Sequence, residues 1–148
     1  MIRPFSLDDL ESILEIETHS FPKSPYDWAT FLNLHLLYPE TFLVYVDTGH
    51  GQEGEKILGY IVFTEERHIL SIAVLPQCRR KGIGRALVQR AMEASPLKKV
   101  WAEVRRSNRG ARAFYSKMGF QTIGTVPDYY GNEDALIIQW TPAAGRSS

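Results

Sequence analysis

The segment that most constrains the fold of this 148-residue chain is residues 72–85, IAVLPQCRRKGIGR. It opens with an apolar run, is interrupted at Pro76, continues through three basic residues and ends with Gly82 and Gly84. Proline ends a strand because it cannot donate to the ladder, and glycine allows close approach of a ligand to the backbone. The pattern therefore predicts a buried strand, a basic loop and a helix. The unpaired N–H groups at the start of that helix attract an anion.

Two common phosphate-binding motifs do not explain this anion site. The Walker pattern G-x-x-x-x-G-K-[ST] is absent from the chain. The dinucleotide pattern G-x-G-x-x-G fails at its third glycine, where Leu87 stands, and it lies in the middle of the chain. A simpler interpretation also stays open, in which the glycines only begin a helix and the arginines are solvated.

The charge of the chain is divided between two segments. The formal net charge is zero, yet residues 1–66 carry twelve acidic and three basic side chains, a net charge of −9. Residues 79–117 carry twelve basic and two acidic side chains, a net charge of +10. This division indicates an anionic partner for the basic segment and a cationic partner for the acidic one, unless both are merely solvated helix faces.

Length and composition favour one globular domain, because 44% hydrophobic and 23% charged residues suit a soluble chain with one core. Hydrophobic periodicity predicts a single mixed α/β domain over residues 1–141 and a flexible tail over 142–148. Ser6 and Asp9 have the spacing of a capping box for the first helix. The expected strands are 2–5, 42–46, 57–63, 68–74, 100–104, 121–127 and 134–140; the expected helices begin at residue 7 and cover 26–37, 82–94 and 109–118, and a glycine-rich loop covers 47–55.

Several other classes of protein are disfavoured. The one cysteine, Cys78, cannot form an internal disulfide or a thiolate cage, and the four histidines lack the spacing of metal ligands. No apolar run approaches the roughly 18 residues of a membrane span, and the amino-terminal segment has no apolar signal region. We therefore expect a cytoplasmic protein that uses no metal.

The central segment resembles the acetyl-CoA-binding signature of the GNAT superfamily of N-acetyltransferases. The matching pattern is V-x-P-x-x-R-x-x-G-x-G at residues 74–84. The second half of the family follows in order and spacing, as WAEVRRSN at 101–108 and AFYSKMGF at 113–120. Within the superfamily the chain is most similar to the ribosomal-protein-alanine N-acetyltransferases and the archaeal and eukaryotic N-terminal acetyltransferases, since FP at 21–22 and DYY at 128–130 fit that branch.

The resemblance covers about residues 2–140 and implies both a fold and a cofactor site. The fold is a mostly antiparallel sheet flanked by helices, in which the parallel strands 68–74 and 100–104 splay apart to admit acetyl-CoA. No metal is implied. The cofactor-binding residues that the resemblance assigns are Ile72, Ala73 and Val74 through backbone groups, Arg79, Arg80, Lys81, Gly82, Ile83, Gly84 and Arg85 around the pyrophosphate, and Asn108 and Tyr115 on the following helix.

The chemistry of acyl transfer suggests two catalytic residues. An α-amine has a pKa of about 7.7–8.0 and is largely protonated at pH 7, so a general base is needed, and Glu103 is our candidate. Tyr115 is our candidate acid for the CoA thiolate, because a phenol is protonated at neutral pH. A backbone N–H of residues 72–74 is the expected oxyanion donor. The alternatives are that Glu103 only pairs with a neighbouring arginine and that Tyr115 only packs beneath residues 119–120.

The acceptor is the least determined part of the prediction. Phe21, Tyr26, Tyr129 and Tyr130 are candidates for an aromatic clamp over the first residues of a peptide, although they are equally suited to a core. We expect transfer to the N-terminal α-amine of a protein or peptide, by a monomer or weak homodimer that does not bind membranes. Lysine side chains or small amines are the alternative acceptors.

A nucleic-acid-binding domain is a less favoured alternative function, since the basic segment lacks any recognisable nucleic-acid motif. A covalent acetyl-enzyme through Cys78 is disfavoured against a structural cysteine.

Overall fold

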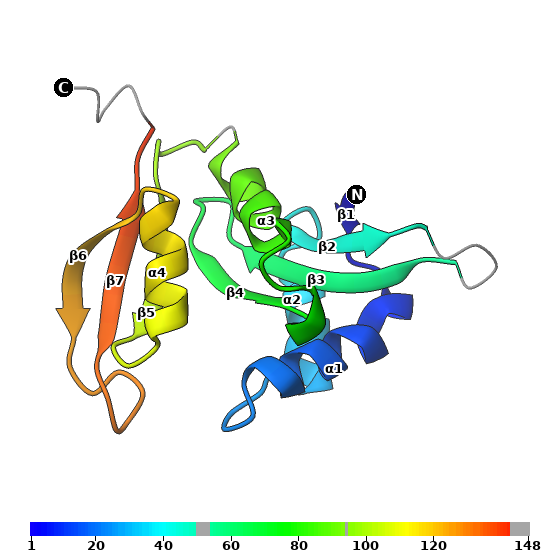
Figure 1. Cartoon of the computed structure of the whole chain (residues 1–148), viewed down its shortest axis with the longest axis horizontal. Coiled ribbons are helices and arrows are strands. Elements are labelled where there is room, and N and C mark those ends of the chain that lie inside the picture. Colours follow the sequence, from blue (N-terminus) through cyan, green and yellow to red (C-terminus); the bar gives the residue numbers. More distant parts are fainter. Residues whose placement is uncertain (50–53, 94, 143–148) are drawn as a thin grey trace.

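The computed structural model describes residues 1–49, 54–93 and 95–142, which form two antiparallel sheets and four α-helices (Figure 1). The predicted mixed α/β class and the predicted order of elements are confirmed. The predicted tail falls outside the described residues except for Pro142, and so do residues 50–53 of the predicted loop. The elements are β1 (Ile2–Pro4), α1 (Leu10–Ser20), α2 (Trp28–Leu37), β2 (Phe42–Asp47), β3 (Lys56–Phe63), β4 (Ile69–Val74), α3 (Ile83–Met92), β5 (Val100–Arg105), α4 (Arg109–Lys117), β6 (Gln121–Val126) and β7 (Ala135–Trp140).

Two helices begin later than predicted, each for a local reason. The first turn of the first helix is a 3-10 turn over Leu7–Asp9, and α1 follows it. The second helix begins at Trp28 rather than at Tyr26, because the Asp27 side chain accepts the Thr30 N–H at 2.9 Å and caps the helix. The predicted capping box of Ser6 and Asp9 is present.

The two sheets meet at one end only. The larger sheet has the strand order β1-β2-β3-β4 and the smaller one β5-β7-β6, each with antiparallel neighbours. Within the described ranges they share one isolated parallel bridge, between His68 and Trp101. There the Trp101 N–H donates to the Arg67 carbonyl at 3.1 Å. Beyond this bridge β4 and β5 are not paired, so the predicted splayed parallel pair is confirmed (Figure 1).

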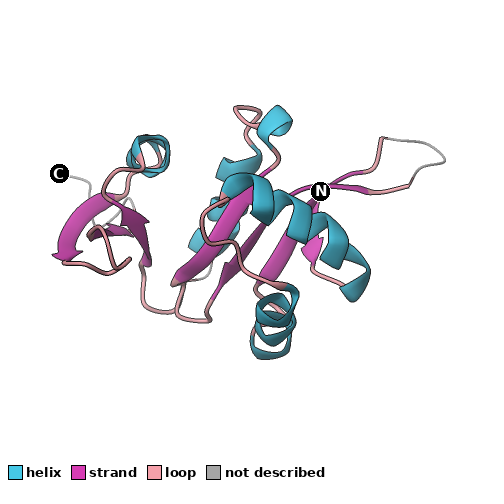
Figure 2. Ribbon diagram, turned by 90° about the horizontal axis from the view of Figure 1, so that it is seen from below, coloured by secondary structure: helices cyan, strands magenta, loops and turns pink. Residues whose placement is uncertain are grey.

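Helices cover both faces of the larger sheet (Figure 2). Neighbouring residues of a strand point to opposite faces, and β3 shows which helix lies on each. The Tyr60 hydroxyl donates to Glu17 of α1, whereas a Cβ added to Gly59 would lie 3.4 Å from Ile83 of α3. The same Cβ would lie 2.9 Å from the Ala73 carbonyl oxygen, so only glycine lets β3, β4 and α3 pack this closely. We call the two faces of the larger sheet the α1 face and the α3 face, after the helix that packs on each.

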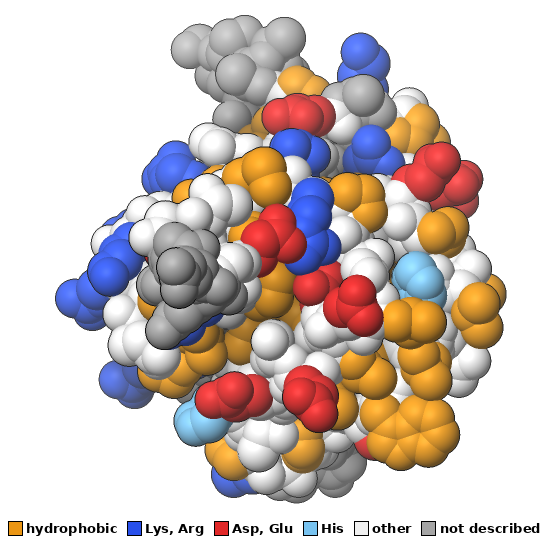
Figure 3. All heavy atoms as spheres, turned by 90° about the vertical axis from the view of Figure 1, so that its right-hand side faces the viewer, with side chains coloured by type: hydrophobic (Ala, Val, Ile, Leu, Met, Phe, Trp, Pro, Cys, Tyr) orange, Lys and Arg blue, Asp and Glu red, His pale blue; other side chains and the backbone are white. Residues whose placement is uncertain are grey.

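The charge division of the sequence is visible on the surface. Figure 3 looks onto the end of the molecule formed by the amino-terminal half. Asp and Glu side chains are spread over this face, and most Lys and Arg side chains lie along its upper and left-hand margins.

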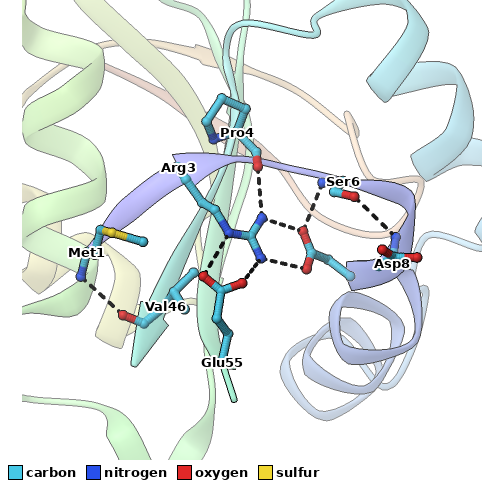
Figure 4. Close-up of polar contacts among 8 residues, drawn as sticks. Met1, Arg3, Pro4, Ser6, Asp8, Val46 and Glu55 are labelled. Atoms are coloured by element: carbon cyan, nitrogen blue, oxygen red, sulfur yellow. Dashed lines mark hydrogen bonds and ion pairs between the residues drawn. The ribbon is translucent and has the colours of Figure 1, made fainter. Parts of the chain in front are cut away.

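The start of the chain is held by a buried carboxylate and one arginine (Figure 4). Arg3 contacts both oxygens of Asp9, at 2.8 and 2.9 Å, and Glu55 at 2.9 Å. Asp9 is only 6% exposed and also accepts the Ser6 N–H at 2.8 Å. Burial acts to raise the pKa of Asp9, but the hydrogen bonds from Arg3 and Ser6 and the charge of Arg3 hold it below its usual value. The folded state therefore favours ionised Asp9.

This geometry predicts a stability that depends on pH. Because the pKa of Asp9 is lower in the folded state, its contribution is present above the unfolded value of about 3.9 and is lost as pH falls through the folded value. Asp9→Ala is expected to lower the free energy of unfolding at pH 7 by about 1.5–3 kcal/mol, measured by urea denaturation. The difference from the unmodified protein should shrink below about pH 4. Asp8→Ala, at the exposed neighbour, is the control, and equal losses for both variants would contradict the assignment.

Candidate active site

The edge of β4 that faces β5 carries free backbone groups. The Leu75 N–H donates to the Leu58 carbonyl at 2.9 Å, and Val74 lies opposite Gly59 in the same register. Because inter-strand bonds alternate along an antiparallel pair, Ala73 bonds to β3 whereas Ile72 and Val74 turn their backbone groups to the open edge. Of the three residues predicted to offer backbone groups, Ile72 and the N–H of Val74 are thus placed to do so, whereas the backbone of Ala73 is engaged with β3 and the Val74 carbonyl accepts from Arg79.

The facing edge of β5 is open in the same way. The Arg106 N–H donates to the Asp134 carbonyl at 3.1 Å, which places the bonds to β7 at Ala102 and Val104. The backbone groups of Glu103 therefore face the gap between the sheets. The Val104 side chain is buried and the Glu103 side chain is partly exposed, so the two faces of β5 differ in exposure.

The glycine-containing turn lies at the end of β4, on the α3 face. Gly82 has φ of 83° and occupies the N-cap position of α3. No side chain accepts a hydrogen bond from the first N–H groups of this helix. Those groups remain donors at the positive end of the helix dipole. Arg80, which also has a positive φ of 64°, is exposed beside it. Lys81 and Arg85 are exposed as well, whereas the Ile83 side chain is buried in the core. The predicted basic loop thus surrounds an uncapped helix start.

The two glycines differ in what surrounds them. A Cβ on Gly82 would meet nothing within 4 Å, so its positive φ is what favours glycine there. A Cβ on Gly84 would lie 3.3 Å from two ring atoms of Phe114 and 3.9 Å from Val74. Gly84 therefore lets α3 and α4 approach each other on the same side of the gap. The sequence predicted that the glycines leave room for phosphates or begin a helix, and this packing role of Gly84 was missed.

Arg79 turns back toward the sheet. Its guanidinium donates to the Val74 carbonyl at 3.2 Å and to the Ser20 hydroxyl at 3.3 Å. It thereby ties the end of β4 to the last residue of α1. In this arrangement the Arg79 guanidinium binds the protein itself at the turn after β4.

Glu103 has a histidine as its partner rather than the arginine that the sequence suggested as an alternative. Its carboxylate lies 2.7 Å from Nε2 of His68, and both side chains are largely buried. The His68 ring stacks on Trp101 with centroids 3.7 Å apart and an angle of 5° between planes. Sequence reasoning missed His68 because it lies 35 residues from Glu103.

Three of the four predicted acceptor residues are influenced by the charge of Glu103. Burial and the charge of Glu17, followed by Tyr129 and Glu103, raise the pKa of Tyr26. The Glu103 charge, with some burial, raises that of Tyr129. Burial, then Tyr129 and Glu103, raises the pKa of Tyr130 to about 12. All three phenols therefore lie within electrostatic range of one carboxylate.

The two tyrosines of the β6–β7 loop are also fixed by contacts of their own. The Tyr129 and Tyr130 rings meet edge to face with centroids 4.9 Å apart, and the Arg105 guanidinium lies 4.1 Å from the centroid of Tyr130. Phe21 differs from them. It is 36% exposed at the end of α1, and in the described part of the chain it has no ring contact with the tyrosines.

Tyr115 and Asn108 belong to α4, which lies across one face of the smaller sheet (Figure 2). Tyr115 is 4% exposed, and burial raises the pKa of its phenol above the usual value. Its ring packs between Phe114 and Phe120, so the predicted packing role is present alongside a protonated hydroxyl. The side-chain Oδ1 of Asn108 caps α4 by accepting the Ala111 N–H at 3.0 Å, and this bond does not use the side-chain NH₂ group.

Other features of the described residues bear on the alternatives. Cys78 is a buried free thiol in a 3-10 turn at Pro76–Cys78. No group of three His, Cys, Asp or Glu side chains in the described ranges is arranged to hold a metal ion. None of the helices described combines the length and apolar character needed to cross a membrane. A cavity of about 750 Å³ lies between α4 and β6, and Tyr115 is on its wall.

Comparison with known proteins identifies the family. The profile of the acetyltransferase (GNAT) family matches residues 8–120. The chain belongs to this family. An uncharacterized N-acetyltransferase of Methanocaldococcus jannaschii is 35% identical over 93% of the chain and 89% of its own length. An N-alpha-acetyltransferase of Sulfurisphaera tokodaii is 31% identical over 93% and 90%. The ribosomal protein bS18-alanine N-acetyltransferase of Escherichia coli is 32% identical over 88% and 89%.

Solved structures agree with this GNAT assignment. Ard1 from Thermoplasma volcanium has a TM-score of 0.80 and 33% identity, over 95% of this chain and 96% of its own. Chaetomium thermophilum Naa20 in complex with a bisubstrate analogue has a TM-score of 0.82 and 28% identity, over 99% and 90%. The predicted membership of the N-terminal acetyltransferase branch is confirmed. The protein is an N-acetyltransferase, and a nucleic-acid-binding domain is therefore not favoured as its main function.

The contact between Gly84 and Phe114 predicts a specific coupling. Gly84→Val should lower the free energy of unfolding by about 1–3 kcal/mol, because its branched side chain enters the space of the Phe114 ring. Phe114→Leu in the same chain should recover part of that loss in a double-mutant cycle measured by urea denaturation. Gly110→Ala, where the nearest atom to a new Cβ is 3.8 Å away, is the matched control. Purely additive losses would show that the two residues are not coupled.

Proposed function

We propose that this N-acetyltransferase moves the acetyl group of acetyl-CoA directly to the N-terminal α-amine of a protein or peptide. The observation that carries the proposal is the open gap between β4 and β5. On one side of it stand the uncapped start of α3 and the helix α4, and on the other stand Glu103 and the three tyrosines. Two substrates can therefore reach the gap from opposite faces and meet in one ternary complex.

The residues around the gap suit acetyl-CoA. When bound, acetyl-CoA supplies the activated acetyl group as a thioester. The pyrophosphate would lie on the N–H groups that open α3, with Arg80, Lys81 and Arg85 around it. The backbone of Ile72 and Val74 would hold the pantetheine arm, and the free amide of Asn108 would donate from α4. The Naa20 structure, which contains a bisubstrate analogue, supports a site for two substrates at this gap.

Glu103 is the proposed general base. An α-amine must lose a proton before it can attack, and a carboxylate within reach, directly or through one water, removes it. The contact with His68 at 2.7 Å orients the carboxylate and offers a second site for the proton. The backbone N–H groups of the open β4 edge would stabilise negative charge on the acetyl oxygen.

Tyr115 is the proposed general acid. A phenol is protonated at neutral pH, and burial, which raises the pKa of Tyr115, keeps it so; its proton can be donated to the departing thiolate. Glu103 lies on the partly exposed face of β5, whereas Tyr115 belongs to the helix that covers the smaller sheet. The base and the acid thus serve the amine and the thiol from different sides.

Tyr26, Tyr129 and Tyr130 are proposed to clamp the first residues of the acceptor, with Phe21 at the outer end. An α-amine is easier to deprotonate than lysine by about 2.5 pKa units, which suits a single carboxylate base. One relative is named an N-alpha-acetyltransferase, and another is named for N-acetylation of an alanine of ribosomal protein bS18. We also propose a cytoplasmic location, since the one cysteine is a free thiol.

The experiment that tests this function compares two versions of one peptide that contains an internal lysine. The first has a free N-terminus and the second an acetylated N-terminus. With acetyl-CoA, mass spectrometry should find one new acetyl group on the free peptide, at its α-amine, and almost none on the blocked peptide. Efficient acetylation of the blocked peptide or of free polyamines, with inert α-amines, would overturn the proposal.

The catalytic roles predict separate kinetic effects. Tyr115→Phe should lower kcat by roughly 10²–10⁴-fold while acetyl-CoA affinity, measured by calorimetry, stays close to that of the unmodified protein. Glu103→Gln should also lower turnover and remove the acid limb of the kcat/KM–pH profile. Glu93→Gln, at the other acidic residue of the basic segment, is the control that should leave the rate unchanged. Normal rates in both folded catalytic variants would refute the roles.

A further inference from the structure

A buried carboxylate outside the proposed chemistry lies directly beneath the acceptor side of the gap. Glu17, in the last turns of α1, is 2% exposed. Burying an ionisable carboxylate is unfavourable unless hydrogen bonds compensate for the lost water, and here burial raises its pKa. Its position in an otherwise apolar face of α1 therefore requires an explanation.

Glu17 has two donors, and they come from different parts of the chain. One carboxylate oxygen accepts the Tyr26 N–H at 2.8 Å. The other accepts from the Tyr60 hydroxyl of β3, which in turn lies 2.8 Å from the Ser71 hydroxyl of β4. Glu17 thus connects α1 to the loop between α1 and α2 and to β3, and through Tyr60 it is linked to β4. We call Glu17, Tyr26, Tyr60 and Ser71 the tether.

The loop that the tether holds has no sheet or helix of its own. It contains Pro22 and Pro25, which lack backbone donors, and joins the end of α1 to Asp27, the cap of α2. The Tyr26 N–H therefore has a side-chain acceptor where regular structure would supply a carbonyl. From this fixed backbone the Tyr26 ring packs edge to face on Phe31, and its hydroxyl lies 3.5 Å from the Leu70 carbonyl oxygen at β4.

We propose that Glu17 is a positioning residue of the acceptor site, which fixes Tyr26 against Leu70 of β4 without touching either substrate. The inference rests on the proposed peptide acceptor site. Loss of the carboxylate would release the Tyr26 backbone and widen the acceptor side of the gap. The α3 face would keep its contacts, because no member of the tether belongs to α3 or α4.

The test separates acceptor binding from cofactor binding. Glu17→Ala should raise the KM for a free-amine peptide by about tenfold, the effect of losing one hydrogen bond to a charged group. The dissociation constant of acetyl-CoA should stay near that of the unmodified protein. Glu17→Gln should restore the peptide KM, because the amide oxygen still accepts the Tyr26 N–H. Glu15→Ala, at an exposed residue of the same helix, is the matched control.

Two further measurements keep the inference open to refutation. Tyr60→Phe keeps the buried ring but removes one donor to Glu17, so it should also raise the peptide KM. This variant replaces Glu17→Ala in the test if the alanine variant does not fold. Amide exchange should show faster exchange at Tyr26 in Glu17→Ala, with α3 protected as before. An unchanged peptide KM, or an equal loss of acetyl-CoA affinity, would overturn the inference. If no peptide is acetylated by the unmodified protein, the proposed function fails, and the exchange measurement still decides whether the tether holds Tyr26.

Discussion

The structure depends on a parallel contact that is made at one end and nowhere further along. The bridge between His68 and Trp101 joins two antiparallel sheets, and the stack of their rings strengthens the joint. Past the bridge, β4 pairs only with the strand β3, and β5 only with the strand β7, in the described part of the chain. The backbone groups on the two facing edges are thus left without a strand partner inside the molecule. Since buried polar groups need partners, such edges favour a ligand that supplies them.

The helices around this gap divide its two sides between two kinds of recognition. On the α3 face, Gly84 allows α3 to approach Phe114 of α4, which brings an uncapped helix start next to α4. On the other side, three phenols lie within electrostatic range of the Glu103 carboxylate. The first environment suits phosphates and the second suits an amine with a peptide behind it.

Buried polar contacts, rather than regular secondary structure, hold the segments that carry the acceptor side. Arg3 and Asp9 fasten the start of the chain, and Glu17 fastens the loop that follows α1. Each contact satisfies a carboxylate removed from water, so each is costly to break on one side only. Of these two contacts, the one made by Glu17 also holds the backbone of Tyr26.

The sequence by itself determined the class of fold, the order of the elements and the strand–loop–helix unit at residues 72–85, because periodicity, proline and glycine act within a segment. It also pointed to Glu103 through the chemistry of acyl transfer, and to Tyr115 through that chemistry together with a family resemblance. Only the tertiary structure showed that His68 is the partner of Glu103 and that Tyr60 is the partner of Glu17, across 35 and 43 residues. It alone showed that Gly84 makes room for Phe114. The physical reason is that spacing along a strand or helix is set locally, whereas contacts between distant residues exist only once the sheets and helices have packed.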